Sequence, residues 1–170
     1  MVLHVPKCLR PAPGFTIVEL VAVILILGIL AAIVTPRFFG RDVFENRGFH
    51  DQVMAALRFA QKAAIAQHQF VCVNFPDSRT VTLTTGPSNA CGTPLSDPAG
   101  NAAYMVSSSQ SAFASLPAAF SFDCLGRPRD VAGAASCSNA AGILATNQTL
   151  QVQNSNAIVV EQETGYVHSP

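Results

Sequence analysis

The stretch Gly14-Phe-Thr-Ile-Val-Glu-Leu20 decides the fold, together with the apolar run that continues from it to Val34. The twenty residues from Phe15 to Val34 contain only two polar side chains, Thr16 and Glu19. As a helix that rises ~1.5 Å per residue, this run is ~30 Å long, which is about the thickness of the hydrocarbon core of a bilayer. We therefore expect a transmembrane helix over residues 15–35.

A carboxylate near the start of this helix points to processing. An ionised Glu19 within a bilayer is costly unless a partner neutralises it. A cut between Gly14 and Phe15 would free an α-amino group one helical turn before Glu19, at positions i and i+4, and would supply that partner. A secretory signal is instead cut after an apolar region of about 7–15 residues. A plain signal anchor that contains a glutamate is the alternative.

These residues resemble the class III leader of type IV prepilins and type II secretion pseudopilins, which also carry a proline after the apolar run, here Pro36. The resemblance implies that a prepilin peptidase removes residues 1–14 and that Phe15 becomes N-methylated. It implies that the helix packs into the core of a helical filament, where Glu19 meets the amino group of a neighbouring Phe15. It also implies a helix break at Pro36. The expected partners are the peptidase, other pilin or pseudopilin subunits, the inner membrane and its assembly platform.

Length and composition limit the part of the chain beyond the apolar run. The chain has 170 residues, so about a hundred remain beyond residue 67 for one small globular domain. Only 12% of the residues are charged, and the formal net charge is zero. No long-range field therefore indicates nucleic acid as a partner.

The cysteines indicate an oxidising compartment. Cys8 lies in the expected leader, which leaves Cys72, Cys91, Cys124 and Cys137 in the exported part. Four cysteines in a small exported domain predict two disulfides, and their pairing is a separate question because more than one connectivity is open. We favour the local pairs, Cys72 with Cys91 and Cys124 with Cys137. A zinc site is the alternative, but no C-x-x-C or H-x-x-x-H element is present.

Charge alone does not set the orientation of the membrane helix. Lys7 and Arg10 precede the apolar run, whereas Arg37, Arg41 and Arg47 follow it. The cysteines and the family resemblance imply a single-pass protein of the inner membrane. The N-terminus would be cytoplasmic and the globular domain periplasmic, until assembly moves the subunit into a pilus or pseudopilus.

Residues 36–67 predict an amphipathic continuation of the helix. Pro36 removes a backbone hydrogen bond and bends or loosens the helix near it. Beyond it, apolar residues recur three and four positions apart, which is typical of one helix face. These residues are Phe49, Val53, Ala56, Leu57, Ala60, Ala63 and Ala64. We expect one helix from about residue 15 to about residue 67, whose second half needs a sheet to cover it.

Residues 68–170 predict a β-rich globular domain. β-like runs separated by turn signals occur at residues 70–75, 80–85, 119–124, 149–153, 157–160 and 166–168. Residues 86–118 have too little apolar periodicity for a buried element, with residues 104–106 as the one candidate. Strands that follow one long helix, without alternating helices, predict an α+β fold with an antiparallel sheet.

Three segments of the globular part resemble the GspH/FimT-like group, and among these the minor pilins of the mannose-sensitive haemagglutinin (MSHA) type. We call them the helix motif, the turn motif and the C-terminal motif. They read Leu57-Arg-Phe-Ala-Gln-Lys-Ala-Ala-Ile-Ala66, Phe120-Ser-Phe-Asp-Cys-Leu-Gly-Arg-Pro128 and Val160-Glu-Gln-Glu-Thr-Gly-Tyr-Val-His168, and Phe38-Phe39 adds to the likeness. The resemblance implies a pilin-like fold.

No enzyme signature is found in the sequence. It contains no G-x-S-x-G, H-E-x-x-H, P-loop or dinucleotide fingerprint. His50, His68 and His168 are too far apart in the chain to indicate a triad. Asp97 and Asn101 offer oxygen ligands, but far fewer than calcium needs. We expect no enzyme activity, no metal and no cofactor.

The strongest binding candidate is the turn around Pro128. Arg127 and Arg129 flank this proline and are expected to be exposed, but two cations give only a weak phosphate footprint. Nucleic acid is therefore not expected as a partner. The function predicted from sequence is a structural subunit, a minor pilin or pseudopilin. The alternatives are a fibre-tip adhesin or DNA-uptake ligand, and a type II secretion pseudopilin of the H type.

Overall fold

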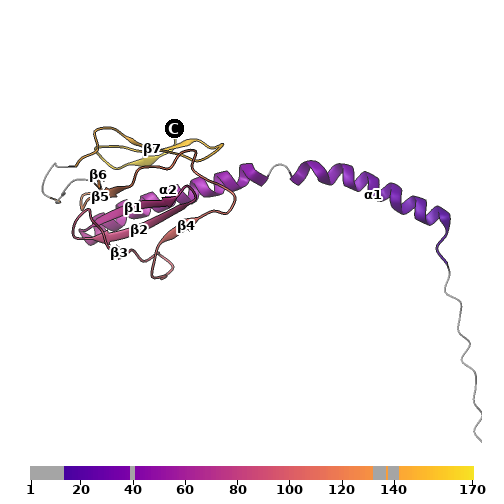
Figure 1. Ribbon diagram of the computed structural model, residues 1–170, viewed down its shortest axis with the longest axis horizontal. Helices are drawn as coiled ribbons and strands as arrows, with labels where there is room; N and C mark the ends of the chain where they lie inside the picture. The colour runs from indigo at the N-terminus through magenta and orange to yellow at the C-terminus, as the bar shows by residue number, and fades with distance from the viewer. Residues whose placement is uncertain (1–13, 39–40, 132–136, 138–141) are drawn as a thin grey trace, which may run out of the picture. The chain divides into compact units, whose positions relative to one another are not determined.

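The computed structural model describes residues 14–38, 41–131, 137 and 142–170 (Figure 1). The chain divides into two compact units, residues 1–40 and 41–170. Helix α1 covers Ile17–Phe38 in the first unit, and helix α2 covers Arg41–Gln67 in the second. Most of the expected leader, including Cys8, lies outside the described residues. The assigned α1 includes Pro36, and the helix break expected there stays a prediction.

Helix α1 is apolar on every side. Each large apolar side chain from Phe15 to Leu30 is 44–83% exposed. A helix without a polar face does not match the surface of a globular protein, where one face is polar. Within the described part of the chain, no helix combines the length and the apolar content needed to cross a membrane. The transmembrane assignment of residues 15–35 stays a prediction.

Helix α2 is amphipathic, and it buries the face that the sequence predicts. Its buried apolar residues are Phe49, Val53, Ala56, Leu57, Ala60, Ala63 and Ala64. The alanines let the helix backbone approach the sheet closely, because no long side chain separates the two. The helix contacts strands β1, β2, β4, β5 and β9, whose bounds are given below. Helix α2 is therefore the spine of the globular unit.

The larger sheet is antiparallel, and its strands run in the order β3-β2-β1-β5-β6, with β4 also paired to β2. Its strands are β1 (Phe70–Asp77), β2 (Thr80–Gly86), β3 (Thr93–Pro94), β4 (Met105–Ser107), β5 (Phe120–Phe122) and β6 (Pro128–Asp130). The predicted β1–β2 hairpin is present, with Val73 opposite Leu83. In its turn, the backbone N–H of Arg79 donates to Asp77 Oδ1 at 2.7 Å.

The smaller sheet comes from the C-terminal end of the chain and shares the same core. Its order is β7-β8-β9, with β7 at Gln148–Gln151, β8 at Ala157–Val160 and β9 at Val167–His168. Leu150, Ile158, Val160 and Val167 are buried in one cluster with the apolar face of α2. One amphipathic helix packed on antiparallel strands is an α+β, pilin-like layout, so the predicted fold class is confirmed.

Within residues 86–118, the one candidate element at residues 104–106 corresponds to β4, but the prediction of an unburied loop is wrong for the rest of the segment. Strand β4 buries Val106, β3 is exposed, and the segment also buries Leu95 and Phe113 in the core. Tyr104 stacks on Phe59 of α2, with ring centroids 5.1 Å apart. The backbone N–H of Leu95 donates to the carbonyl of Leu83 at 3.1 Å, which attaches the segment to β2. The strands of this segment are only two or three residues long, and no periodicity can reveal pieces of that length.

Candidate functional site

The expected cleavage site lies in non-helical backbone just before α1. Gly14, Phe15 and Thr16 are exposed and non-helical, and the helix begins at Ile17. A Cβ placed on Gly14 would meet no atom within 4 Å. Packing among the described residues therefore does not require glycine at position 14.

Thr16 caps the N-terminus of α1. The backbone N–H of Glu19 donates to Thr16 Oγ1 at 3.2 Å, and the N–H of Leu20 donates to the carbonyl of Thr16 at 3.1 Å. Thr16 is thus the N-cap residue, and Glu19 occupies the third helical position. The prediction from sequence omits this cap, although Thr-x-x-Glu is the spacing of a capping box.

Glu19 lies in the first turn of α1, where a negative charge interacts favourably with the helix dipole. Its side chain is exposed. No ion pair of Glu19 is found among the described residues. The carboxylate is therefore open to a cation from outside the described part of the chain.

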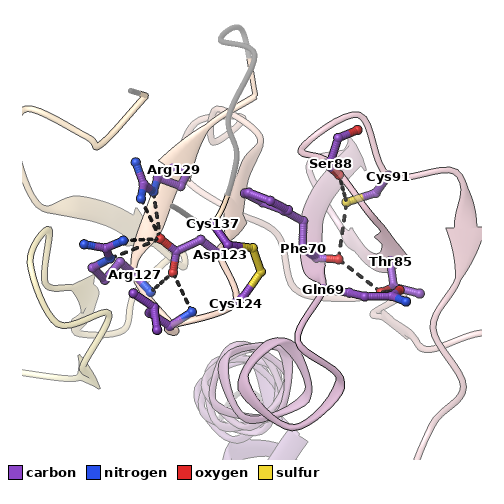
Figure 2. Close-up of a disulfide and its surroundings, with 11 residues drawn as sticks. Gln69, Phe70, Thr85, Ser88, Cys91, Asp123, Cys124, Arg127, Arg129 and Cys137 are labelled. Carbon is purple, nitrogen blue, oxygen red and sulfur yellow. Dashed lines mark hydrogen bonds and ion pairs between the residues drawn. A yellow bond between two sulfur atoms is a disulfide. The ribbon is translucent and has the colours of Figure 1, made fainter. Parts of the chain in front are cut away.

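Two disulfides lie in the globular unit. They join Cys72 to Cys91, with Cα atoms 6.0 Å apart, and Cys124 to Cys137, with Cα atoms 5.6 Å apart. These are the two pairs that the sequence favours. Phe70 at the start of β1 packs with Cys124, Cys91 and Cys137 in a small second core (Figure 2). The ring of Phe70 thus packs against cysteines of both disulfides.

Next to Cys124, Asp123 forms a buried ionic cluster with Arg127 and Arg129. Figure 2 shows both arginine side chains pointing at the Asp123 carboxylate. Arg129 Nε and Nη2 donate to Asp123 Oδ2 at 2.9 and 2.7 Å, and Arg127 Nε donates to the same oxygen at 3.1 Å. The other oxygen, Oδ1, accepts the backbone N–H groups of Leu125 and Arg127, each at 2.9 Å. The Asp123 carboxylate therefore stabilises the turn between β5 and β6 through both of its oxygens.

We predicted from the sequence that the side chains of Arg127 and Arg129 are exposed, and this prediction is wrong for Arg129. The side chains of Arg129 and Asp123 are both 0% exposed, and that of Arg127 is 29% exposed. The sequence around Pro128 looks like a solvated turn, whereas residues 128–130 form strand β6 beside β5. The prediction from sequence missed Asp123 as the ionic partner of both arginines. Its position four residues before Arg127 and six before Arg129 was the pattern that could have indicated this pairing. Arg129 is therefore not one of the two exposed cations that the sequence predicts in this turn.

The pKa of the Asp123 carboxyl is lowered from its usual value of 3.8. Burial by itself raises this pKa, because it disfavours the charged form. The opposing effects are larger together: the N–H of Arg127, the guanidinium of Arg129, the N–H of Leu125 and the charge of Arg127 all favour the carboxylate. Asp123 is therefore ionised at neutral pH, and the cluster carries two positive charges against one negative.

The three motifs meet at what we call the C-terminal joint, which consists of Gln61, Gly126, Thr164 and Gly165. Gln61 Nε2, from the helix motif, donates to the carbonyl of Gly126 at 3.1 Å and to that of Thr164 at 2.9 Å. A Cβ on Gly165 would overlap the carbonyl oxygen of Gly126, and one on Gly126 would lie 2.7 Å from Ile65 Cδ1. Gly126 and Gly165 both have positive φ, +80° and +69° respectively. Glycine is therefore required twice in this joint.

A second helix side chain supports the joint one turn earlier. Arg58 Nε and Nη2 donate to the carbonyl of Val167 at 3.2 and 3.1 Å. Beyond that carbonyl, the ring of His168 stacks on Tyr166, and its Nε2 lies 3.0 Å from Glu161 Oε1. Segments more than 60 residues apart in sequence thus form one packed unit around α2.

The remaining candidates do not gather into a site. Asn101 donates to both carboxylate oxygens of Asp97, at 2.6 and 2.8 Å, so these two residues satisfy each other within one turn. His50 pairs with Asp51 at 3.1 Å, whereas His168 pairs with Glu161. Within the described residues, no group of three or more metal-ligating side chains is found.

Comparison with known proteins agrees with the N-terminal geometry. Residues 10–35 match the prokaryotic N-terminal methylation motif, which covers well under half of the chain. The chain is also similar to the type IV narrow pilus major component PilA5 of Thermus thermophilus, with 45% identity over 56 residues. The chain is type IV pilin-like. The match spans 33% of this chain and 48% of that relative, and no solved structure matches the chain.

Replacing Gly165 by alanine should destabilise the globular unit. The new Cβ would overlap the Gly126 carbonyl, and alanine at a positive φ is strained, so we expect a loss of about 3 kcal/mol. Gly92→Ala is the matched control, because a Cβ there meets nothing within 4 Å. Denaturant unfolding of both variants checks this, and equal midpoints would contradict the close packing.

Replacing Asp123 by asparagine should cost about 3 kcal/mol near pH 7, because Arg129 would stay buried without a carboxylate. The pKa of Asp123 is lower in the folded chain than in the unfolded chain. Its stabilisation is therefore complete above the unfolded value, and it is lost as the pH falls through the folded one. We expect the melting temperature of the wild type to fall below about pH 4 and that of Asp123→Asn to fall less. Parallel acid profiles would argue against this role for Asp123.

Proposed function

We propose that this chain is a structural subunit of a type IV pilus or pseudopilus, cut by a prepilin peptidase between Gly14 and Phe15. One observation carries the proposal: an exposed, non-helical Gly14–Phe15 bond directly precedes a helix that is apolar on all sides and has Glu19 in its first turn. N-methylation of Phe15 follows cleavage. The matched methylation motif over residues 10–35 supports this assignment.

An apolar helix of this kind needs an apolar environment before and after assembly. In the unassembled subunit, residues 15–35 span the inner membrane once, with the N-terminus in the cytoplasm and the globular unit in the periplasm. The two disulfides fit an oxidising compartment outside the cytoplasm. In the fibre, the helices of neighbouring subunits replace the lipid, and an assembly platform in the membrane transfers each subunit.

Glu19 fixes the axial position of the apolar helix relative to the helix of a neighbouring subunit. The ridges and grooves of an apolar helix repeat along its length, so packing alone is satisfied at several axial offsets and does not select one of them. A carboxylate in an apolar environment is costly unless it is paired. Pairing of Glu19 with the freed amine of Phe15 on a neighbouring subunit therefore selects one arrangement. The pair acts through specificity more than through net stability.

The narrower assignment is a minor subunit of the GspH/FimT-like group, of the MSHA type. What supports it is the C-terminal joint, where the three motifs of that resemblance pack together through Gln61, Gly126 and Gly165. A pseudopilin of the H type in a type II secretion system shares this group. Quantifying this subunit against the most abundant one in sheared fibres and in secretion-system preparations separates these roles.

Gly14→Val should leave residues 1–14 attached. Among the described residues, a Cβ at this position meets no atom within 4 Å, so we expect the substitution to act through the fit to the peptidase. Intact-mass measurement of the membrane fraction should show the full-length chain for Gly14→Val and the shortened chain for the wild type. Gly92→Val serves as the control and should be shortened normally, because position 92 is equally free of neighbours. Normal shortening of Gly14→Val would refute cleavage at this bond.

Glu19→Ala should leave membrane insertion and cleavage intact and reduce incorporation into fibres at least tenfold, about the effect of losing 1.4 kcal/mol per subunit contact. The physical reason is that the freed amine of a neighbouring Phe15 loses its partner in an apolar environment. The measurement is the amount of subunit in sheared fibres at equal membrane levels. Glu45→Ala, an exposed carboxylate on α2, is the matched control. Equal recovery of Glu19→Ala and the wild type would exclude an assembly role for this carboxylate.

A further inference from the structure

We propose that a cavity beside Tyr104, in the globular unit, binds a basic side chain, arginine or lysine, from another protein chain. The inference goes beyond the proposed function, which does not involve this part of the molecule. The Tyr104 cavity has a volume of about 280 Å³. This volume is below the ~300–1,000 Å³ typical of sites for drug-sized ligands, so it suits a single side chain. The lining residues are Asp97, Pro98, Ala99, Tyr104, Met105 and Val106.

The Tyr104 cavity carries a negative charge that no cation neutralises within the part of the chain that the structure describes. The side-chain and backbone N–H groups of Asn101 donate to the two carboxylate oxygens of Asp97, at 2.6 and 2.8 Å. These bonds lower the pKa of Asp97 from its usual value of 3.8, so the carboxylate is ionised at neutral pH. Asn101 is neutral, and none of the ion pairs among the described residues includes Asp97. The hydrogen bonds therefore hold the carboxylate in place without cancelling its charge.

Tyr104 adds an aromatic wall next to this carboxylate. Its ring stacks on Phe59 of α2, with an interplanar angle of 17°, so its orientation is fixed by the core. Burial raises the pKa of Tyr104, and the charge of Asp97 raises it further, so the carboxylate and the phenol lie close enough to interact. Aromatic faces attract cations because of the ring quadrupole. The charge of Asp97 and the ring of Tyr104 therefore both favour a positive ligand.

The other walls of the Tyr104 cavity are apolar, which favours a cation on an aliphatic stem. Met105 is 62% exposed on β4, next to the buried Val106, and Pro98 and Ala99 are exposed as well. Lysine and arginine lay their methylene stems along apolar surface and keep the charged end near polar groups. A metal ion gains nothing from such walls, and one carboxylate supplies too few oxygens for calcium. The chemistry thus fits a basic side chain better than a metal ion.

Methyl NMR of the full chain in uncharged detergent micelles tests this site, with the methionine methyl groups labelled with carbon-13. Met105 is the reporter, and Met54, which packs against the core, is the internal control. The probe is N-acetylarginine methylamide, and its neutral counterpart is N-acetylcitrulline methylamide. We expect the arginine probe to shift the Met105 methyl signal saturably and the citrulline probe to leave it unchanged. Equal shifts with both probes, or no shift with the arginine probe, would overturn the inference.

A variant without the carboxylate tests the role of its charge. Asp97→Asn should bind the arginine probe about fivefold more weakly, as for the loss of a partly exposed ion pair. Glu163→Gln is the matched control, because it removes an exposed carboxylate elsewhere, and it should bind like the wild type. Wild-type affinity of Asp97→Asn would overturn the inference. If the Met54 signal shows that Asp97→Asn is misfolded, the comparison of the two probes on the wild type still decides.

Oxidation by hydrogen peroxide distinguishes two sources of the basic side chain. Peroxide transfers one oxygen atom to the thioether of an accessible methionine, which yields the sulfoxide and water. Oxidation of Met105 in dispersed subunits but not in sheared fibres would assign the side chain to a neighbouring subunit, and equal oxidation would assign it to a protein outside the fibre. This comparison alone depends on the proposed function. If that function is wrong, no fibres contain the chain, whereas the NMR titration still gives its result.

Discussion

The globular unit depends on the buried carboxylate of Asp123. Its two oxygens accept hydrogen bonds from two guanidinium groups and two backbone N–H groups, and this fixes the turn between β5 and β6. The turn presents the carbonyl of Gly126, which binds Gln61 of α2 and packs against Gly165 before β9. A single buried ionic cluster therefore links the helix, the larger sheet and the C-terminal strands. Such a cluster adds more to the uniqueness of the fold than to its net stability.

The two helices differ in which of their side chains are buried. Helix α2 has one apolar face and buries it in the core of its own unit, so its sequence is constrained by packing. Helix α1 is apolar on all sides and exposes its side chains, so its sequence is constrained by its surroundings. Between Phe15 and Val34, polar side chains occur only where the helix begins, at Thr16 and Glu19. The polar side chains of this apolar run thus concentrate at the start of α1, whereas the globular unit has its own core.

Local patterns predicted the elements well, because their physical cause is local. The spacing from Phe49 to Ala64 follows the helix period, and each residue of that face is buried. Alternation in β1 and β2 predicted the hairpin, and four exported cysteines predicted two cross-links. Short strands such as β3 and β6 escaped prediction, since two or three residues carry no period. The exposed position expected for Arg129 failed for another reason: a charged side chain in a turn is exposed unless a partner is buried with it.

By itself, the sequence determined the α+β class, the apolar helix and the amphipathic face, since each depends on residues within a few turns of one another. Only the tertiary structure decided the partners of Arg129, the buried segment around Leu95 and the joint of Gln61 with Gly126 and Gly165. Gln61 bonds to carbonyls 65 and 103 residues away, whereas Arg129 pairs with Asp123 six residues away because the core buries both side chains. No local sequence pattern predicts contacts between residues so far apart in the chain. These contacts form only when α2 and the two sheets bury a common core.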